Sequence, residues 1–497
     1  MKRLMLSIVA IAATTGTLYG QSYAPDALKF SQTNFGSSAR FKAMGGAQIG
    51  VGGDMSSLGG NPAGLGLFTK SEFSLTPEFN SMMGKSTYLN TQVESTKDRL
   101  NLNNIGVVFY SPTFRMKGQD AQKGVISTVF GIGYNRNNDF GAEFNYEGRN
   151  PKNSIADYFS ELANGTGLEP DQLRAGLPQM AYEGFIIGHD ADGYFPQTDV
   201  NNDQAKNEVR SGSTSELTAS GAINISNQVY IGASVGLVNV RYINDSEFVE
   251  SGYNVTEASD YSLSMRQSQE TTGSGYNARL GVIFRPADNF RIGATLQSPS
   301  WLFIQDNTTL VVDSRITTGS NPGTYTNQPV NYIFNYRVRT PLKGALGASY
   351  VVAGKALISA DVDFVDYSSI RFSTDQGSEP ETIMEENNIV RNSYKSAVNY
   401  RLGAEYKVNS QVSLRGGYGL NGSAIKDDDS GYFDTNFYTG GLGYRVNNYY
   451  LDLAYQRMET NTDLSPYEVG PASAPEEPVA NIKTIRNNVF LTFGVRF

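Results

Sequence analysis

The stretch Phe290-Arg291-Ile292-Gly293-Ala294-Thr295-Leu296-Gln297 alternates strictly between two kinds of residue. Its apolar members are Phe290, Ile292, Ala294 and Leu296. Successive side chains of a β-strand point to opposite faces, so this period of two predicts a strand with one apolar face and one polar face. One face suits lipid and the other suits an aqueous lumen.

Similar alternation recurs from about residue 70 to the end of the chain. Candidate strands begin near Glu72, Asn104, Val125, Glu216, Val229, Gly275, Phe290, Leu342, Ala356, Tyr400, Val412, Phe437, Tyr449 and Val489. A water-soluble sandwich alternates too, but these segments approach the 9 to 11 residues of a tilted transmembrane strand, and the sequence lacks amphipathic helices that would cover a sheet. The count is even, as a closed bacterial barrel requires. We therefore expect an all-β fold, a transmembrane antiparallel β-barrel of about 14 strands over residues 69–497.

The composition agrees with a barrel and excludes several other classes of protein. The chain has 52 Gly, 30 Tyr and 26 Phe, yet its mean hydropathy is −0.35. Barrel strands reconcile these values, because only alternate residues meet lipid. The absence of Cys excludes disulfides and a lipid-anchored cysteine. A net charge of −9 argues against a nucleic-acid partner. No metal or cofactor is expected.

The first 68 residues lie ahead of the predicted barrel. Lys2 and Arg3 precede an apolar run and then small residues up to Gly20, which is typical of a secretory signal peptide at residues 1–20. Export and a barrel together predict the bacterial outer membrane. Residues 21–68 lack alternation and are either a periplasmic tail or a plug inside the lumen. Phe30, Phe35 and Phe41 favour the plug, since a disordered tail would carry fewer aromatic residues.

The connections between the predicted strands alternate between short and long. This asymmetry is typical of outer-membrane barrels. The longest connection is expected at residues 139–215, with others at 306–328, 373–396 and 460–483. Helical spacing of Ile155, Tyr158, Phe159 and Leu162 predicts helical structure within the longest one.

Several stretches resemble one known family. The run MGGAQIGVGGDMSSLGGNPAGL begins at Met44 and is followed by SEFSLTPEF from Ser71. The stretches RPADNFRIGATLQSP, TPLKGALGASY, YRLGAEYKV and VSLRGGYGLNGSA follow in order. Together they resemble the FadL/TodX family of hydrophobic-compound transporters over nearly the whole mature chain. The resemblance implies a fourteen-stranded barrel, a hatch in the lumen, and a kinked third strand that leaves a lateral opening. It also implies passive uptake of hydrophobic small molecules, such as long-chain fatty acids, with lateral release into the membrane.

Two motifs are candidates for controlling that opening. Asn61-Pro62-Ala63 is suited to a simple turn, but the resemblance implies that it lies beside the kinked strand and helps to gate the opening. The predicted third strand, 125–138, contains Gly131 and Gly133 followed by Asn135 and Asn138. Glycines and polar residues weaken strand pairing, so we expect the lateral opening there. The alternative is that the two glycines face the lumen and leave room for the hatch.

A fatty-acid carboxylate would require a cation in the lumen. Alternation points Lys343, Arg401 and Arg415 inward, so each is a candidate for contacting it. The alternative is that they pair with inward acids such as Glu405.

The last strand ends in Phe497, and Val489, Leu491, Phe493 and Val495 share its face. A terminal aromatic residue on an alternating strand resembles the signal that the barrel assembly machinery recognises. The alternative is an ordinary final strand.

Three other functions remain as alternatives. They are a binding or adhesion protein that uses the barrel as a platform for its loops, an open porin, and a barrel enzyme. The plug-like segment argues against a porin. The single histidine, His189, lies in a polar loop, which argues against an enzyme. We expect a monomer whose other contacts are outer-membrane lipid and lipopolysaccharide.

Overall fold

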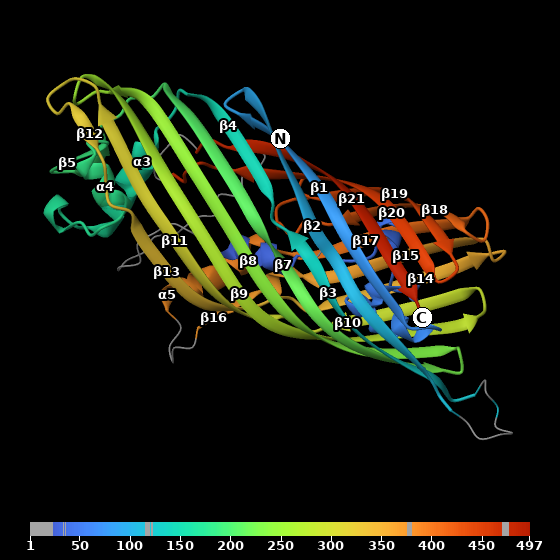
Figure 1. Cartoon of the computed structure of the whole chain (residues 1–497). Coiled ribbons are helices and arrows are strands. Elements are labelled where there is room, and N and C mark those ends of the chain that lie inside the picture. Colours follow the sequence, from blue (N-terminus) through green and yellow to red (C-terminus); the bar gives the residue numbers. More distant parts are fainter. Residues whose placement is uncertain are drawn as a thin grey trace.

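The computed structural model describes residues 23–32, 34, 36–114, 120, 123–374, 380–469 and 477–497. The predicted signal peptide and Phe35 lie outside these residues. Fourteen antiparallel strands close into a barrel (Figure 1), which confirms the predicted fold. In order around the wall they are β1 (Glu72–Tyr88), β2 (Thr91–Pro112), β3 (Val125–Asp139), β7 (Asn202–Ile225), β8 (Val229–Asn254), β9 (Ser259–Ala287), β10 (Phe290–Gln297), β14 (Lys343–Val352), β15 (Ala356–Asp366), β17 (Ser396–Lys407), β18 (Val412–Asn421), β19 (Thr435–Val446), β20 (Tyr449–Leu464) and β21 (Ala480–Arg496). The pairing of β21 with β1 closes the circuit.

Several wall strands are longer than the sequence predicts. Three supposed connections are partly strand, because β7 begins at Asn202, β11 (Trp301–Ile316) covers much of 306–328, and β20 and β21 extend into 460–483. The prediction of one long loop at 139–215 was therefore wrong at both ends, since β4 (Ala142–Asn150) also lies within it. The sequence pattern did not predict these extensions, because strand segments that project beyond the membrane face water and carry polar residues on the outer face.

The wall is much taller on one side than on the other. Strands β7, β8, β9 and β11 rise well past the ends of β14, β15, β17, β18 and β19 (Figure 1). Above β10 and β14 the wall continues as β11 and β13 (Val330–Arg339), with bends at Pro299 and Pro341. The short strands β12 (Gly323–Tyr325) and β16 (Arg371–Ser373) pair with β11 and β13. The tall side thus forms an extracellular half-shell.

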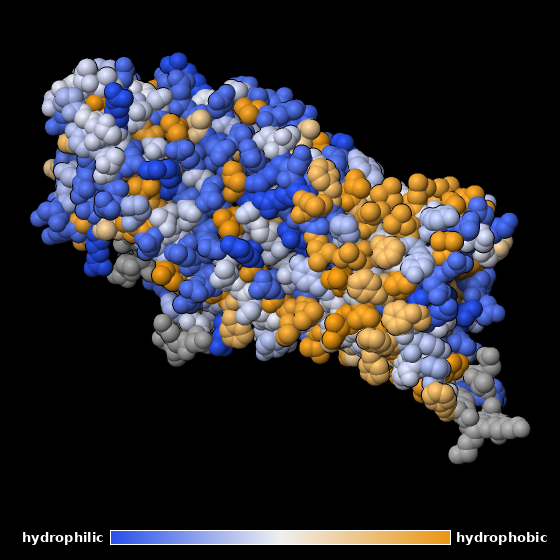
Figure 2. Space-filling view, viewed as in Figure 1, coloured by the Kyte–Doolittle hydropathy of each residue, from blue (hydrophilic) through white to orange (hydrophobic). Residues whose placement is uncertain are grey.

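The outer surface shows where the membrane lies. Apolar side chains gather on the half that contains the C-terminus, whereas the half-shell is mostly hydrophilic (Figure 2). Exposed aromatic residues occupy both edges of the apolar band, as expected at membrane interfaces. The outer edge carries Tyr276, Trp301, Phe364, Tyr400, Tyr418, Tyr438 and Tyr455, and the edge near the short turns carries Phe284, Tyr350, Tyr406, Tyr444 and Tyr449. None of the described helices has the length and apolarity needed to cross a membrane.

The connection between β4 and β7 folds into a small helical cap. It contains α3 (Ile155–Thr166), η3 (Pro170–Gln172), α4 (Leu177–Glu183) and the hairpin β5 (Ile187–Asp190) to β6 (Gly193–Pro196). The helix predicted from the spacing of Ile155 and Phe159 is confirmed as α3. Its apolar side packs on inward residues of the half-shell, including Phe248 and Leu310.

Candidate functional site: a plugged lumen with a gap in its wall

The N-terminal segment occupies the interior of the barrel. It contains α1 (Ala24–Ser31), α2 (Ala39–Ala43), η1 (Met55–Leu58) and η2 (Pro62–Leu67), and we call residues 23–68 the hatch. Glycines let the hatch backbone approach the wall. A Cβ added at Gly293 would lie 2.0 Å from the Ile49 carbonyl oxygen, and one at Gly417 would lie 2.3 Å from the Gly45 nitrogen. Any larger residue at either position would push the hatch away from the wall.

One side of the hatch meets the wall through charges. Arg40 pairs with Glu405 at 2.9 Å, and Arg415 bridges Glu405 at 2.7 Å and Asp452 at 2.6 Å. The Asp361 carboxylate accepts hydrogen bonds from two consecutive hatch amides at 2.5 and 2.9 Å. These contacts fix the position of the hatch by directional bonds.

The opposite side of the hatch meets β2, β3 and β7 through apolar contacts. Met55, Leu58, Leu65 and Phe68 pack against Val108, Val129 and Ala222. Both predicted glycines of the third strand lie here. Gly131 and Gly133 face the lumen, and an added Cβ at either would lie within 2.7 Å of the Leu58 side chain. They pair regularly with β2, opposite Val108 and Gly106.

The ladder between β2 and β3 stops partway up the wall. It runs from Pro112 opposite Ser127 to Asn104 opposite Asn135. Above this point, residues 91–103 of β2 pair only with β1 within the described chain. β3 is irregular between Arg136 and Asn138, and the chain then continues as β4 on the inner side of the β1–β2 hairpin. An added Cβ at Gly84, on that inner face, would touch the Glu143 carbonyl oxygen and the Phe144 ring.

A hatch segment fills the lower end of this gap. The Asn34 amide donates to the Asn137 carbonyl oxygen at 2.8 Å, and the Asn103 side-chain amide donates to the Ser37 carbonyl oxygen. A Cβ added at Gly36 would lie 2.6 Å from the Arg136 nitrogen and 2.9 Å from the Asn103 carbonyl oxygen. The segment is therefore wedged between the edges of two wall strands.

The two predicted asparagines of the third strand border the gap. Asn135 accepts a hydrogen bond from the Asn104 side chain at 2.7 Å, at the last rung of the ladder. Asn138 donates to the Lys29 carbonyl oxygen at 3.2 Å and accepts from the Asn34 side chain at 3.4 Å. Both residues thus lie between the wall and the hatch. Asn34, Gly36 and Ser37 could not be predicted from the sequence, because nothing local distinguishes Gly36 from the other glycines of the chain.

The Asn61-Pro62-Ala63 motif lies mainly against β8 and β9. Asn61 caps η2 through its side-chain oxygen, which accepts from the Ala63 amide at 3.1 Å. Its side-chain amide donates to the Ile49 carbonyl oxygen at 2.8 Å. An added Cβ at Gly232 or Gly281 would collide with the motif. Leu58, rather than this motif, is the hatch residue against Gly131 and Gly133.

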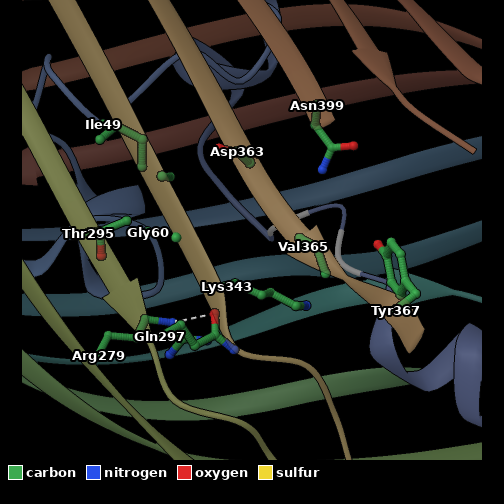
Figure 3. Close-up of a pocket in the computed structure, with 12 residues that line it drawn as sticks. Ile49, Gly60, Arg279, Thr295, Gln297, Lys343, Asp363, Val365, Tyr367 and Asn399 are labelled. Carbon is green, nitrogen blue, oxygen red and sulfur yellow. Dashed lines mark hydrogen bonds between the residues drawn. The ribbon is translucent and has the colours of Figure 1, made fainter. Parts of the chain in front are cut away.

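A small cavity with both apolar and charged lining residues lies between the hatch and the wall (Figure 3). Its volume is about 40 Å³, room for only a few waters. Lys343 faces it together with Arg279, Asp363 and Tyr367. The Lys343 ammonium donates to the Ser31 carbonyl oxygen at 2.7 Å. Arg279 is buried and forms an ion pair with Glu216 at 2.5 Å. Of the predicted cations, Lys343 is the one that lines this cavity.

Arg401 and Arg415 have acidic partners. Arg401 lies 3.5 Å from Asp363 and donates to the Asn421 side chain at 2.9 Å. Arg415 lies between Glu405 and Asp452, deep in the charged side of the hatch interface. This placement agrees with the structural alternative considered for these two residues.

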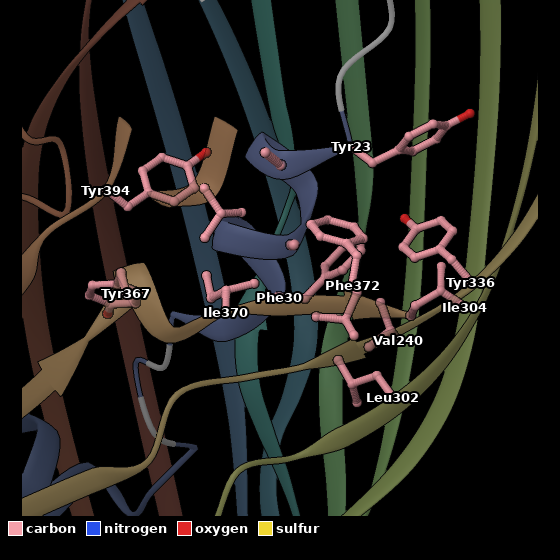
Figure 4. Packing of buried hydrophobic residues seen from close by; sticks show 14 of the residues in the cluster. Tyr23, Phe30, Val240, Leu302, Ile304, Tyr336, Tyr367, Ile370, Phe372 and Tyr394 are labelled. Carbon is pink, nitrogen blue, oxygen red and sulfur yellow. The ribbon is translucent and has the colours of Figure 1, made fainter. Parts of the chain in front are cut away.

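An aromatic cluster lies above the cavity, around helix α1 (Figure 4). Phe30 of α1 and Tyr23, which precedes the helix, pack with Tyr336 and Phe372 of the half-shell. Helix α5 (Glu381–Ser393) covers α1. The Glu386 carboxylate of α5 accepts hydrogen bonds from the Tyr23 and Ala24 amides at 3.0 and 2.8 Å. The full cluster is Tyr23, Ala24, Ala27, Phe30, Phe140, Val238, Val240, Tyr242, Leu302, Ile304, Tyr336, Val338, Val365, Tyr367, Ile370, Phe372, Ile383, Val390, Tyr394, Ala397 and Ala424.

Two other predicted residues lie away from the lumen. The Phe497 side chain is 62% exposed at the end of β21, and its amide donates to the Ser71 carbonyl oxygen at 2.9 Å. Its role in assembly stays a prediction. His189 is in the β5–β6 hairpin, 3.6 Å from the Glu169 carboxylate and against the Tyr194 ring.

Comparison with known proteins identifies the family. The sequence profile described as outer membrane protein transport protein (OMPP1/FadL/TodX) matches residues 197–469. The chain belongs to this family. Its location in the bacterial outer membrane and its class, a transporter of hydrophobic compounds, follow from that membership. No curated protein sequence matches the chain.

Solved structures of family members share the fold. The toluene transporter TodX of Pseudomonas putida aligns with a TM-score of 0.53 and 13% identity, over 93% of this chain and 98% of TodX. A FadL homologue from Pseudomonas aeruginosa aligns with a TM-score of 0.51 and 14% identity, over 93% and 98% of the two chains. Identities this low establish only the common fold.

Proposed function

We propose that this FadL/TodX-family protein takes up hydrophobic small molecules, such as long-chain fatty acids, and releases them sideways into the outer membrane through the gap between β2 and β3. The observation that carries the proposal is the edge of β2 at residues 91–103, which has no strand partner besides β1 in the described chain. The described hatch residues Asn34, Gly36 and Ser37 lie at the lower end of the gap. A local shift of this short hatch segment opens a path from the lumen to the membrane.

The exit into the bilayer has a simple driving force. An alkyl chain gains roughly 0.8 kcal/mol for each CH₂ that leaves water. A long-chain ligand therefore favours lipid over the periplasm by many kcal/mol, and passage needs no energy source. The lateral route also spares the ligand from displacing the charged side of the hatch, where Arg40, Glu405 and Arg415 form a continuous network.

The interior of the barrel has adjoining apolar and charged sites that suit an amphiphilic ligand. Val365 and Tyr367 line the cavity beside Lys343 and also belong to the aromatic cluster above it, so the two sites adjoin. We propose that the cluster receives the apolar part of the ligand and that Lys343 contacts its carboxylate. The cavity is small when the hatch is closed, so binding requires α1 to move and Lys343 to exchange the Ser31 carbonyl oxygen for the ligand.

A crosslink across the gap tests the route. The chain has no Cys, so Ser37→Cys with Asn103→Cys introduces one pair that ties the hatch to the edge of β2. The matched control is Ala43→Cys with Ala454→Cys, which ties buried alanines in contact at the far side of the hatch. Both proteins are assayed for uptake of a fluorescently labelled dodecanoic acid, with each crosslink verified by mass spectrometry.

We expect the gap crosslink to abolish uptake and a reductant to restore it, while the control crosslink leaves uptake near wild type. Wild-type uptake through the crosslinked gap would refute lateral release. Loss of uptake in the control alone would instead support passage past a displaced hatch.

A second assay tests the ligand class. Lys343→Gln removes the cation, and charge-assisted hydrogen bonds contribute about 1.5–3 kcal/mol, so binding of dodecanoate should weaken roughly tenfold or more. Binding of toluene, which has no carboxylate, should not change. Equal losses for both ligands would mean that Lys343 acts only by holding Ser31 and the hatch.

A further inference from the structure

The outer edge of the membrane crosses the tall side of the wall at a defined row. Tyr276 and Trp301 are paired on β9 and β11, and their rings stack at 5.4 Å. Below Tyr276 on the outer face of β9 are exposed Leu280 and Val282, and above it is Ser274. Aromatic residues at a change from apolar to polar side chains mark the headgroup level.

Two arginines lie at the same level on the next strands of the sheet. Trp301 is paired with Arg339 of β13, and Arg339 is paired with Arg371 of β16. Both arginines are exposed on the outer face, because their chain neighbours Val338 and Phe372 form the next pair and point inward, where they are buried. Arg337 lies one step higher, with its guanidinium 4.8 Å from the centre of the Phe303 ring.

Two arginines placed directly opposite each other on adjacent strands repel. Two other exposed arginines of the half-shell have acidic partners. Arg241 pairs with Glu270 at 3.2 Å, and Arg266 pairs with Asp313. Within the described part of the chain, neither Arg339 nor Arg371 has an ion-pair partner. An anion at the headgroup level would offset their repulsion.

We propose that Arg339 and Arg371, with Arg337 beside them, bind the phosphates of an outer-leaflet glycolipid of the lipid A type. The planar guanidinium group matches phosphate by two parallel hydrogen bonds. The acyl chains of such a lipid would lie below, against Trp301 and the apolar band. The site lies on the outer wall, apart from the transport route, and it anchors the tall side of the barrel in the outer leaflet.

Lipid retention measures this interaction. The purified protein is titrated with bis-phosphorylated lipid A, and the bound lipid is counted by native mass spectrometry. The test variant is Arg339→Gln with Arg371→Gln, and the matched control is Arg241→Gln with Arg266→Gln, which neutralises two exposed but paired arginines of the same outer face. Heat-modifiability on a gel confirms that each variant is folded.

We expect lipid A binding to weaken roughly fivefold for each arginine removed at Arg339 and Arg371, and to stay near wild type in the control. The lipid A affinity of Arg339→Lys with Arg371→Lys should fall between those of the wild type and the glutamine variant. Lysine keeps the positive charge but cannot donate two parallel hydrogen bonds to one phosphate. The wild-type protein should bind dephosphorylated lipid A as weakly as the glutamine variant binds lipid A. Equal binding of phosphorylated and dephosphorylated lipid by the wild-type protein would overturn the proposal. So would full displacement by inorganic phosphate alone, which would make the site a simple anion site.

Discussion

The lower and upper halves of strand β8 use the same alternation in opposite senses. In the membrane half, Ile231 and Val235 point outward and are exposed, while Ser234 points inward and is buried. In the half-shell, Glu247 points outward and Phe248 points inward. Period two is unbroken across the change, so the backbone is the same and only the surroundings differ.

The polarity of the β8 side chains therefore follows the surroundings on each side of the wall. Outside the lower half is hydrocarbon, where a polar side chain is costly, and outside the upper half is water. Inside the lower half is a hatch with a charged side, and inside the upper half are the apolar faces of α1, α3 and α4. A substitution on the inner or outer face of either half should therefore have an effect set by the lipid, water or protein that contacts that face.

The largest effect should come from emptying the lower half. Deleting residues 21–60 removes the hatch as far as Gly60 and leaves inward polar residues such as Glu405 and Asp452 facing an open lumen. A polar lumen fills with water, so single-channel conductance in planar bilayers should rise from closed to porin-like. A full-length protein that already conducts like a porin would contradict the hatch as a plug.

The apolar inner face of the upper half is tested by Phe248→Ala. Removing a fully buried phenylalanine costs about 3–5 kcal/mol, so the cap formed by α3 and α4 should loosen. Hydrogen exchange in α3 should become faster. Ser234→Ala changes the same face of the same strand in the lower half and should have little effect, and equal exchange in both variants would contradict the inversion.

The outer faces are compared with Leu280→Arg and Ser268→Arg on β9. Leu280 is 63% exposed in the apolar band, and a charge at the middle of the bilayer costs about 2–4 kcal/mol. Ser268 is exposed in the half-shell and donates to the Asp245 carboxylate at 2.6 Å, so an arginine there meets water and an acid. Refolding into liposomes at increasing urea concentration should fall for Leu280→Arg alone. Equal losses would place the membrane boundary elsewhere.

The smallest effect is expected at the exposed ion pair of the half-shell. Arg241 and Glu270 are 3.2 Å apart, with side chains 62% and 52% exposed. Such pairs contribute about 0.2–1 kcal/mol, less at high salt. A double-mutant cycle of Arg241→Gln and Glu270→Gln, measured by urea unfolding, should give a coupling energy in this range. A larger value would mean that the upper outer face is shielded from water.

The sequence predicted the wall better than the site. Each of the fourteen predicted segments overlaps one of the fourteen wall strands, because lipid imposes a regular alternation that is visible locally. Charged residues inside the barrel were also recognised, but only some of their partners were. Arg415 pairs with Glu405, which the sequence pattern predicted because both residues point inward. It also pairs with Asp452 on β20, which the sequence pattern did not predict.

Sequence alone determined that this chain is an outer-membrane barrel with an N-terminal segment of a different kind, since alternation, aromatic content and glycine content are properties of the chain itself. Only the tertiary structure decided where the wall opens. Gly131 and Gly133 look like weak points, yet they pair normally and make room for Leu58. The gap arises where β4 turns inward and Gly36 wedges between Asn103 and Arg136. These contacts join segments about 65 to 100 residues apart, and long-range packing of this kind leaves no periodic signal in the sequence.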